Sequence, residues 1–131
     1  MPYLNLSYAS AEVPSHADLA VVLTDLTVAR LGKKRELTVV TVQRVPLADW
    51  FLGGAGLGPG QSGALLEIRI TAGTNTKGEK AAFIREVFDA LEEHLPRLVP
   101  ASYVNLHEPP ADAWGYAGLT QEYRYIEGAR L

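Results

Sequence analysis

Apolar and polar residues follow a strand-like period at the start of the chain and a helix-like period after it. Residues 2–8 alternate and predict a strand. The next apolar residues recur at helical spacing, and Pro14 and Ser15 predict the start of a helix of about 16 residues. Gly32 predicts the end of this helix as a left-handed cap. The β-branched stretch 36–45 predicts a second strand.

The same order recurs after a glycine-rich segment at residues 51–63. The pair Thr76 and Glu79 predicts a capping box that opens a helix around 77–95, and apolar residues lie on one face of that helix. Three further strands are predicted, at 64–72, 102–108 and 121–126.

This repeat predicts one α/β (α+β) domain over residues 1–131, with βαβ units at 2–45 and 64–108 and a tail at 109–131. Right-handed crossovers would place both helices on one face of a four-stranded sheet, with short extra strands. The other face would carry a second apolar set, or its neighbours in the alternation: Leu4, Leu6, Val40, Val42, Ile68, Ile70, Val104 and Leu106. Because such a face needs a cover, we expect a homo-oligomer.

Composition narrows the class of protein. The 131 residues are 47% apolar, which fits one globular domain, and the net charge of −3 offers no basic surface, so we expect no nucleic-acid partner. The absence of cysteine excludes thiolate catalysis and thiolate metal ligands. The three histidines are far apart in the sequence, so we expect no metal. With no long apolar run and no signal-peptide pattern, we expect a soluble cytoplasmic protein with no membrane partner.

Pro2 is the main candidate for chemistry, because it follows the initiator methionine and leads directly into the first predicted strand. Removal of Met1 would leave a secondary amine at the chain end. An α-amino group titrates near about 8, and burial or nearby cations lower its pKa. Such an amine could act as a general base or as a nucleophile. A retained Met1 would instead make this nitrogen an amide, and Pro2 would then serve only as a second residue.

Several segments resemble, in the same order, the tautomerase superfamily. Besides the Pro2 start and the duplicated βαβ unit, segment 50–54 (WFLGG) is similar to the aromatic and Gly-Gly segment of 4-oxalocrotonate tautomerase. The longer stretch 42–54 resembles cis-3-chloroacrylic acid dehalogenase. Segments 103–106 (YVNL) and 113–116 (AWGY) are similar to pocket segments of macrophage migration inhibitory factor.

The resemblance implies the fold of that superfamily, a homotrimer, and cofactor-independent proton transfer within small keto or enol acids by Pro2. It implies that Asn105 and Tyr103 polarise the substrate carbonyl. The substrate-binding residues that it implies are Lys33, Trp50, Trp114 and Tyr116.

The chain departs from these relatives where they hold carboxylates with arginine. Residues 10–12 (SAE), Val39 and residues 72–75 (AGTN) stand at those places. Because an acidic substrate favours a charge-assisted clamp, other cations must replace the missing arginines. The possible substitutes are Lys33, Arg35, Arg44 and Arg69, of which we count Lys33 and Arg69 among the substrate-binding residues.

Three other functions stay open. Residues 70–80 loosely resemble 5-carboxymethyl-2-hydroxymuconate isomerases, and a dehalogenase or decarboxylase could use the same proline. A non-catalytic trimeric binding module with a vestigial pocket would suit a retained Met1 and the missing arginines. An unrelated ferredoxin-like binding domain is the third.

Overall fold

The computed structural model describes residues 1–129 and contains the four-stranded sheet that the sequence predicts. The strand order is β2-β1-β5-β6, with β1–β2 and β5–β6 parallel and β1–β5 antiparallel, so the two βαβ units meet at the centre of the sheet. The strands are β1 (Tyr3–Ala9), β2 (Val39–Arg44), β5 (Gly63–Arg69) and β6 (Tyr103–His107).

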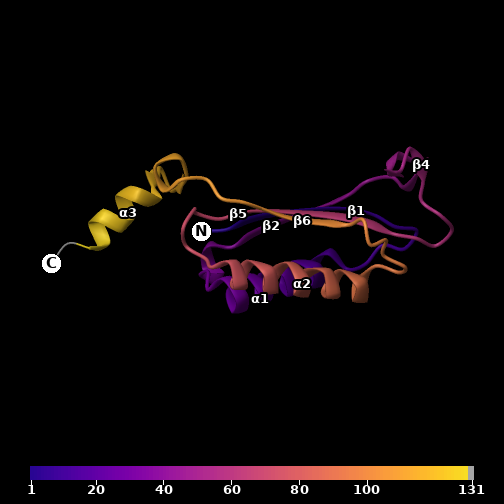
Figure 1. Cartoon of the computed structure of the whole chain (residues 1–131), viewed down its shortest axis with the longest axis horizontal. Helices are drawn as coiled ribbons and strands as arrows, with labels where there is room; N and C mark the ends of the chain where they lie inside the picture. The colour runs from indigo at the N-terminus through magenta and orange to yellow at the C-terminus, as the bar shows by residue number, and fades with distance from the viewer. Residues whose placement is uncertain (130–131) are drawn as a thin grey trace.

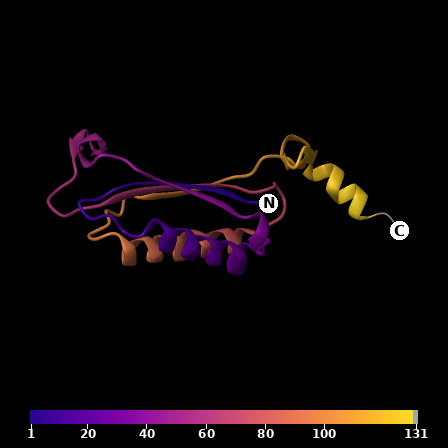
Figure 2. The same cartoon turned by 180° about the vertical axis from the view of Figure 1, so that it is seen from behind.

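Helices α1 (His16–Leu31) and α2 (Lys77–His94) lie side by side on one face of this sheet (Figures 1 and 2). Their ends confirm the predicted caps. The Ser15 hydroxyl accepts a hydrogen bond from the Asp18 amide, and Gly32 has φ +67° at the other end of α1. Thr76 and Glu79 form both hydrogen bonds of the capping box of α2.

The face of the sheet that packs on the helices carries the apolar set that the sequence pattern predicts for the opposite face. Leu4, Leu6, Ile68 and Ile70 are fully buried in the core, and the other four of that set pack against it. The open face carries their neighbours in the alternation, which are mixed in character rather than apolar: Tyr3, Asn5, Ser7, Val39, Thr41, Gln43, Leu65, Glu67, Arg69, Tyr103, Asn105 and His107. The prediction of a second apolar face is therefore wrong, and it no longer supports an oligomer.

Short elements lie at both ends of the sheet. The hairpin of β3 (Phe51–Leu52) and β4 (Ala55–Gly56) lies at the end far from the N-terminus (Figure 1). A second hairpin, β7 (Gly115–Tyr116) and β8 (Leu119–Thr120), follows the last long strand. Single 3₁₀ turns complete the connections: η1 (Arg35–Leu37), η2 (Leu47–Asp49) and η3 (Ala111–Ala113).

The predicted terminal strand at 121–126 is wrong, because this segment is the helix α3 (Gln121–Gly128). Thr120 caps the helix by accepting a hydrogen bond from the Tyr123 amide, which favours a helix over a strand. Helix α3 projects beyond the end of the sheet at which the N-terminus lies (Figures 1 and 2). Within residues 1–129, no helix is both long and apolar enough to cross a membrane.

Candidate active site

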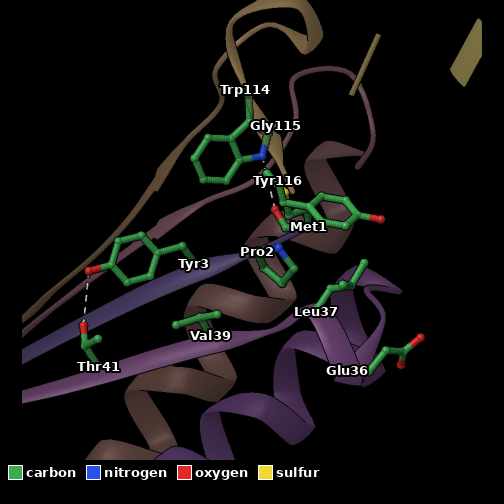
Figure 3. Close-up of a pocket in the computed structure, with 10 residues that line it drawn as sticks. All are labelled: Met1, Pro2, Tyr3, Glu36, Leu37, Val39, Thr41, Trp114, Gly115 and Tyr116. Carbon is green, nitrogen blue, oxygen red and sulfur yellow. Dashed lines mark hydrogen bonds between the residues drawn. The ribbon is translucent and has the colours of Figure 1, made fainter. Parts of the chain in front are cut away.

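Pro2 lines a cavity of about 540 Å³ at the end of the sheet where β1 and β2 begin (Figure 3). Three of the residues implied as site residues, Pro2, Trp114 and Tyr116, come together here. Apolar and aromatic side chains dominate the lining, and the Glu36 carboxylate points away from the Pro2 ring in Figure 3. The complete lining is Met1, Pro2, Tyr3, Glu36, Leu37, Val39, Thr41, Trp114, Gly115 and Tyr116.

Backbone hydrogen bonds hold the two walls of this cavity. The Val39 amide donates to the Pro2 carbonyl oxygen over 3.2 Å, which ties Pro2 to the start of β2. On the other wall, the Gln121 amide donates to the Trp114 carbonyl oxygen over 2.8 Å, and Gln121 is buried. The C-terminal hairpin and α3 therefore hold Trp114 over the start of β1.

Met1 fills the space next to Pro2. The Trp114 indole Nε1 donates a hydrogen bond to the Met1 carbonyl oxygen over 3.2 Å (Figure 3). Partial burial lowers the pKa of the Met1 α-amino group, and the positive charges of Lys33 and Lys34 lower it further. An amine at this end of the chain is thus more easily deprotonated than an amine in water.

Lys33 lies in a neighbouring cavity of about 380 Å³, between the end of α1 and α3. Its Nζ donates a hydrogen bond to Thr74 Oγ1 over 2.8 Å. Burial lowers the pKa of Lys33, while the carboxylates of Glu79 and Glu108 act in the opposite direction. Met1, Leu37 and Tyr116 line both cavities, so Lys33 is a near neighbour of the Pro2 site.

Within one chain, Trp50 lies near the end of the four-stranded sheet opposite Pro2. Its indole Nε1 is 2.4 Å from the position that a Cβ on Gly63 would occupy, and Gly63 pairs with Ala9 at the end of β1 opposite Pro2. A strand of this length spans about 20 Å, so Trp50 does not reach the Pro2 cavity of the same chain.

Tyr103 and Asn105 lie on the open face of β6 and do not line the Pro2 cavity either. Tyr103 is 68% exposed, and Asn105 contacts the His107 ring through its amide nitrogen at 3.2 Å. Strand β5 lies between β6 and β1 in the sheet, and Pro2 directly precedes β1. Within one chain these two residues are therefore not in contact with Pro2.

The possible substitutes for the missing arginines fall in different places. Arg69 pairs with Tyr3 across β1 and β5 and shares the open face with it, next to the Pro2 cavity. Arg35 forms an exposed ion pair with Asp25. Arg44 donates to the Ser10 carbonyl oxygen over 3.0 Å, at the far end of β2.

Sequence reasoning missed Arg124, which lines the cavity of Lys33. Its segment reads as an alternating strand, and only the Thr120 cap could have shown that Arg124 belongs to a helix that folds back on Tyr116. Among residues 1–129, no three His, Asp or Glu side chains are grouped so that they could hold a metal ion.

Comparisons with known proteins support the predicted resemblance. The family model described as "Tautomerase enzyme" matches residues 65–122. No curated protein matches the chain by sequence. The family match confirms the resemblance to the tautomerase superfamily over residues 65–122, and the solved structures show the fold of the whole chain.

Three of those structures illustrate the likeness. The crystal structure of Pt0534 inactivated by 2-oxo-3-pentynoate superposes with a TM-score of 0.80 at 17% identity, over 93% of this chain and 98% of that one. A fused 4-OT, a symmetric trimer, has a TM-score of 0.79 at 24% identity, over 98% of this chain and 99% of that one. Macrophage migration inhibitory factor from Oncomelania hupensis has a TM-score of 0.74 at 17% identity, over 90% of this chain and 95% of that one. At these identities the likeness establishes the fold.

Proposed function

We propose that this chain, with Met1 removed, is a tautomerase or isomerase that moves a proton within a small keto or enol acid. The Pro2 secondary amine is the general base. The observation that carries this proposal is the position of Pro2, inside a mostly apolar cavity of about 540 Å³ at the end of β1. The tautomerase family match and fold support the same class of reaction.

The surroundings favour the neutral amine that a base requires. Partial burial, Lys33 and Lys34 lower the pKa of the Met1 α-amino group. We expect the same two positive charges to act on the amine of Pro2, the next residue along the chain, once Met1 is removed. A base with a pKa near the working pH transfers protons efficiently, so this depression suits catalysis near neutral pH.

In the proposed reaction the neutral Pro2 nitrogen takes the proton from the carbon next to the substrate carbonyl. Negative charge develops on the carbonyl oxygen and needs a hydrogen-bond donor. Within one chain, the Trp114 indole N–H is such a donor beside Pro2, since it already binds a carbonyl oxygen there. The proton then returns from Pro2 to another carbon. This chemistry requires no cofactor.

Other implied residues can reach a Pro2 cavity only from a second copy of the chain. Trp50, Tyr103 and Asn105 lie away from their own Pro2, and we propose that a homotrimer brings such residues to a neighbour's cavity. The fused 4-OT, which has the same fold, is a symmetric trimer. Helix α3 also has only eight residues and exposes Tyr125 and Ile126, so packing on another copy would stabilise it.

Replacement of Pro2 tests the function. We expect the processed wild type, identified by intact mass, to ketonise phenylpyruvate enol or 2-hydroxymuconate faster than buffer, and Pro2→Ala to lose most of that rate. A processed wild type with no rate above buffer on either substrate would contradict the proposal.

A covalent probe tests the same amine without turnover. A neutral Pro2 amine would add to the alkyne of 2-oxo-3-pentynoate, the compound that inactivates Pt0534. A nitrogen–carbon bond forms, one π bond of the alkyne is lost, and the amine proton moves to the adjacent carbon. We expect one adduct per chain, located at Pro2, and no adduct at Pro2 when Met1 is retained, because that nitrogen is then an amide.

A non-catalytic binding module is the second candidate, and one contact favours it. Met1 is hydrogen-bonded to Trp114 and lines both cavities, so a chain that keeps Met1 has an ordered N-terminus and no basic amine at Pro2. Intact mass separates the two candidates, because the binding module keeps Met1 in the mature protein.

A further inference from the structure

The cavity next to the Pro2 site is basic. We call it the basic cavity and define it by its lining: Met1, Gly32, Lys33, Lys34, Leu37, Tyr116, Gln121, Arg124 and Tyr125. Three of these side chains are cationic, and no Asp or Glu of residues 1–129 is among them. A partly enclosed space with this charge favours an anion.

Two contacts fix Arg124 within the basic cavity. Its Nη2 donates to the Tyr116 carbonyl oxygen over 3.0 Å, and its guanidinium carbon lies 3.7 Å from the centre of the Tyr116 ring. The same tyrosine lines the Pro2 cavity. Tyr116 therefore holds the guanidinium at the boundary between the two cavities.

Arg124 keeps donors for a ligand. The hydrogen bond to Tyr116 uses one of the five N–H donors of a guanidinium. The Nε atom is buried and has no hydrogen-bond partner among the residues that the structure describes. A buried donor without a partner is costly, so an acceptor that reaches it after the loss of Met1, which lines the same cavity, would bind favourably.

Met1 separates the basic cavity from the Pro2 cavity. Met1, Leu37 and Tyr116 are the residues that the two linings share, and in Figure 3 Met1 lies beside the Pro2 ring near Tyr116 and Leu37. Removal of Met1 would take away a shared wall, and one space would then contain the Pro2 amine and the cations. A small acid could place its reacting carbon at Pro2 and its carboxylate among the cations.

We propose that the basic cavity, with Arg124 as its anchor, binds the carboxylate of the substrate whose proton Pro2 moves. This inference rests on the function proposed above and names its substrate class, a monocarboxylic keto or enol acid. Lys33 and Lys34 add positive charge, and the planar guanidinium fits a carboxylate with two parallel hydrogen bonds. Arg124 thus replaces the arginines that this chain lacks after its first and third strands.

Binding without turnover tests the inference. Calorimetry with the processed protein would compare phenylacetate with its neutral isostere, phenylacetamide. We expect phenylacetate to bind more tightly, and Arg124→Gln to weaken phenylacetate by roughly 10- to 100-fold, the range for a hydrogen bond to a charged group. Phenylacetamide binding would not change. Inorganic phosphate distinguishes a carboxylate site from a general anion site, and we expect it to compete weakly.

The control is Arg97→Gln, which removes the same charge at the opposite end of the sheet, where Arg97 Nη1 donates to the Pro59 carbonyl oxygen over 2.7 Å. It should leave both affinities unchanged. Arg124→Lys keeps the charge without the planar fork and should recover part of the lost affinity. A thermal melt of each variant shows whether it is folded.

Equal affinity for acid and amide would overturn the inference, as would an Arg124→Gln variant, folded by its melt, that binds phenylacetate like the wild type. Tighter binding of phosphate than of phenylacetate would also overturn it. Because no step of this test needs catalysis, an inactive protein that still binds through Arg124 contradicts only the proposed function. An active protein whose binding ignores Arg124 contradicts only the carboxylate site.

Discussion

The Trp114 indole nitrogen lies 3.2 Å from the Met1 carbonyl oxygen, and the carbon of that carbonyl is bonded to the Pro2 nitrogen. The indole N–H is therefore already directed at an oxygen that lies one bond beyond an atom attached to Pro2. A substrate carbonyl in contact with a free Pro2 amine would need a donor at nearly this place. In the proposed reaction, the Met1 carbonyl oxygen thus lies where we expect the substrate oxygen to bind.

Trp114→Phe keeps an aromatic wall and removes only the indole donor. We expect kcat for phenylpyruvate tautomerisation by the processed protein to fall roughly 3- to 10-fold, the worth of one neutral hydrogen bond. KM should change less, because the donor acts mainly on the developing negative charge. The indole N–H resonance of Trp114 should also move when a carboxylic inhibitor binds. An unchanged kcat would contradict the role of the indole.

Lys33→Gln should shift the pH dependence of catalysis. Positive charge at Lys33 lowers the pKa of the Met1 α-amino group, and we expect it to lower the pKa of a terminal Pro2 amine too, so its removal should raise that pKa. The base works in its neutral form, and the acid limb of kcat/KM must then move to higher pH. A pH–rate profile measures this shift, and Arg97→Gln should leave the limb in place. A shift to lower pH would contradict the assignment of Pro2 as the base.

Gly63→Ala tests whether Trp50 serves a neighbouring copy. A Cβ at Gly63 would lie 2.4 Å from the Trp50 indole nitrogen, so the ring must move. If Trp50 walls the cavity of another copy, tautomerase activity should fall although the Pro2 of the same chain is untouched. Gly56→Ala, where an added Cβ meets nothing within 4 Å, is the matched control. Light scattering shows whether either variant changes the oligomer, which we expect to be a trimer.

Gly115→Ala should disrupt the hairpin that carries Trp114 and Tyr116. An added Cβ would lie 2.1 Å from the Leu119 carbonyl oxygen, a backbone atom that cannot turn aside. We expect a loss of about 1–3 kcal/mol in the free energy of unfolding, measured by denaturant titration, together with loss of phenylacetate binding. Gly128→Ala, with open space around its added Cβ, should change neither.

The sequence predicted the parts of this fold whose signals are local. Ser15 and Gly32 bound the first helix, and Thr76 with Glu79 opens the second, because capping depends on residues three or four apart. The face on which each strand packs was not predictable in the same way. Both alternation sets contain apolar residues, and the choice between them depends on strand register and on helix packing, which are long-range.

The residues of the candidate site were predicted only in part, because their positions also depend on long-range packing. Pro2, Trp114 and Tyr116 meet because the chain after β6 returns to the start of β1, and the family resemblance implied all three as site residues. Trp50 lies far from Pro2 because β5 runs antiparallel to β1, and local sequence motifs do not show in which direction a strand runs. Arg124 was missed because the period-two alternation of residues 121–126 suggested a strand, while the Thr120 cap produced a helix.

The antiparallel pairing of β1 with β5 makes the two ends of the sheet counterparts under an approximate two-fold axis, so the start of β5 at Gly63 corresponds to the start of β1. A polypeptide begins only once, and the second counterpart is an ordinary peptide link inside the chain. Because two such units share one chain, each chain can present one terminal proline nitrogen and not two. At the start of β5 the place of that nitrogen is taken by ordinary chain, and the indole of Trp50 lies against Gly63.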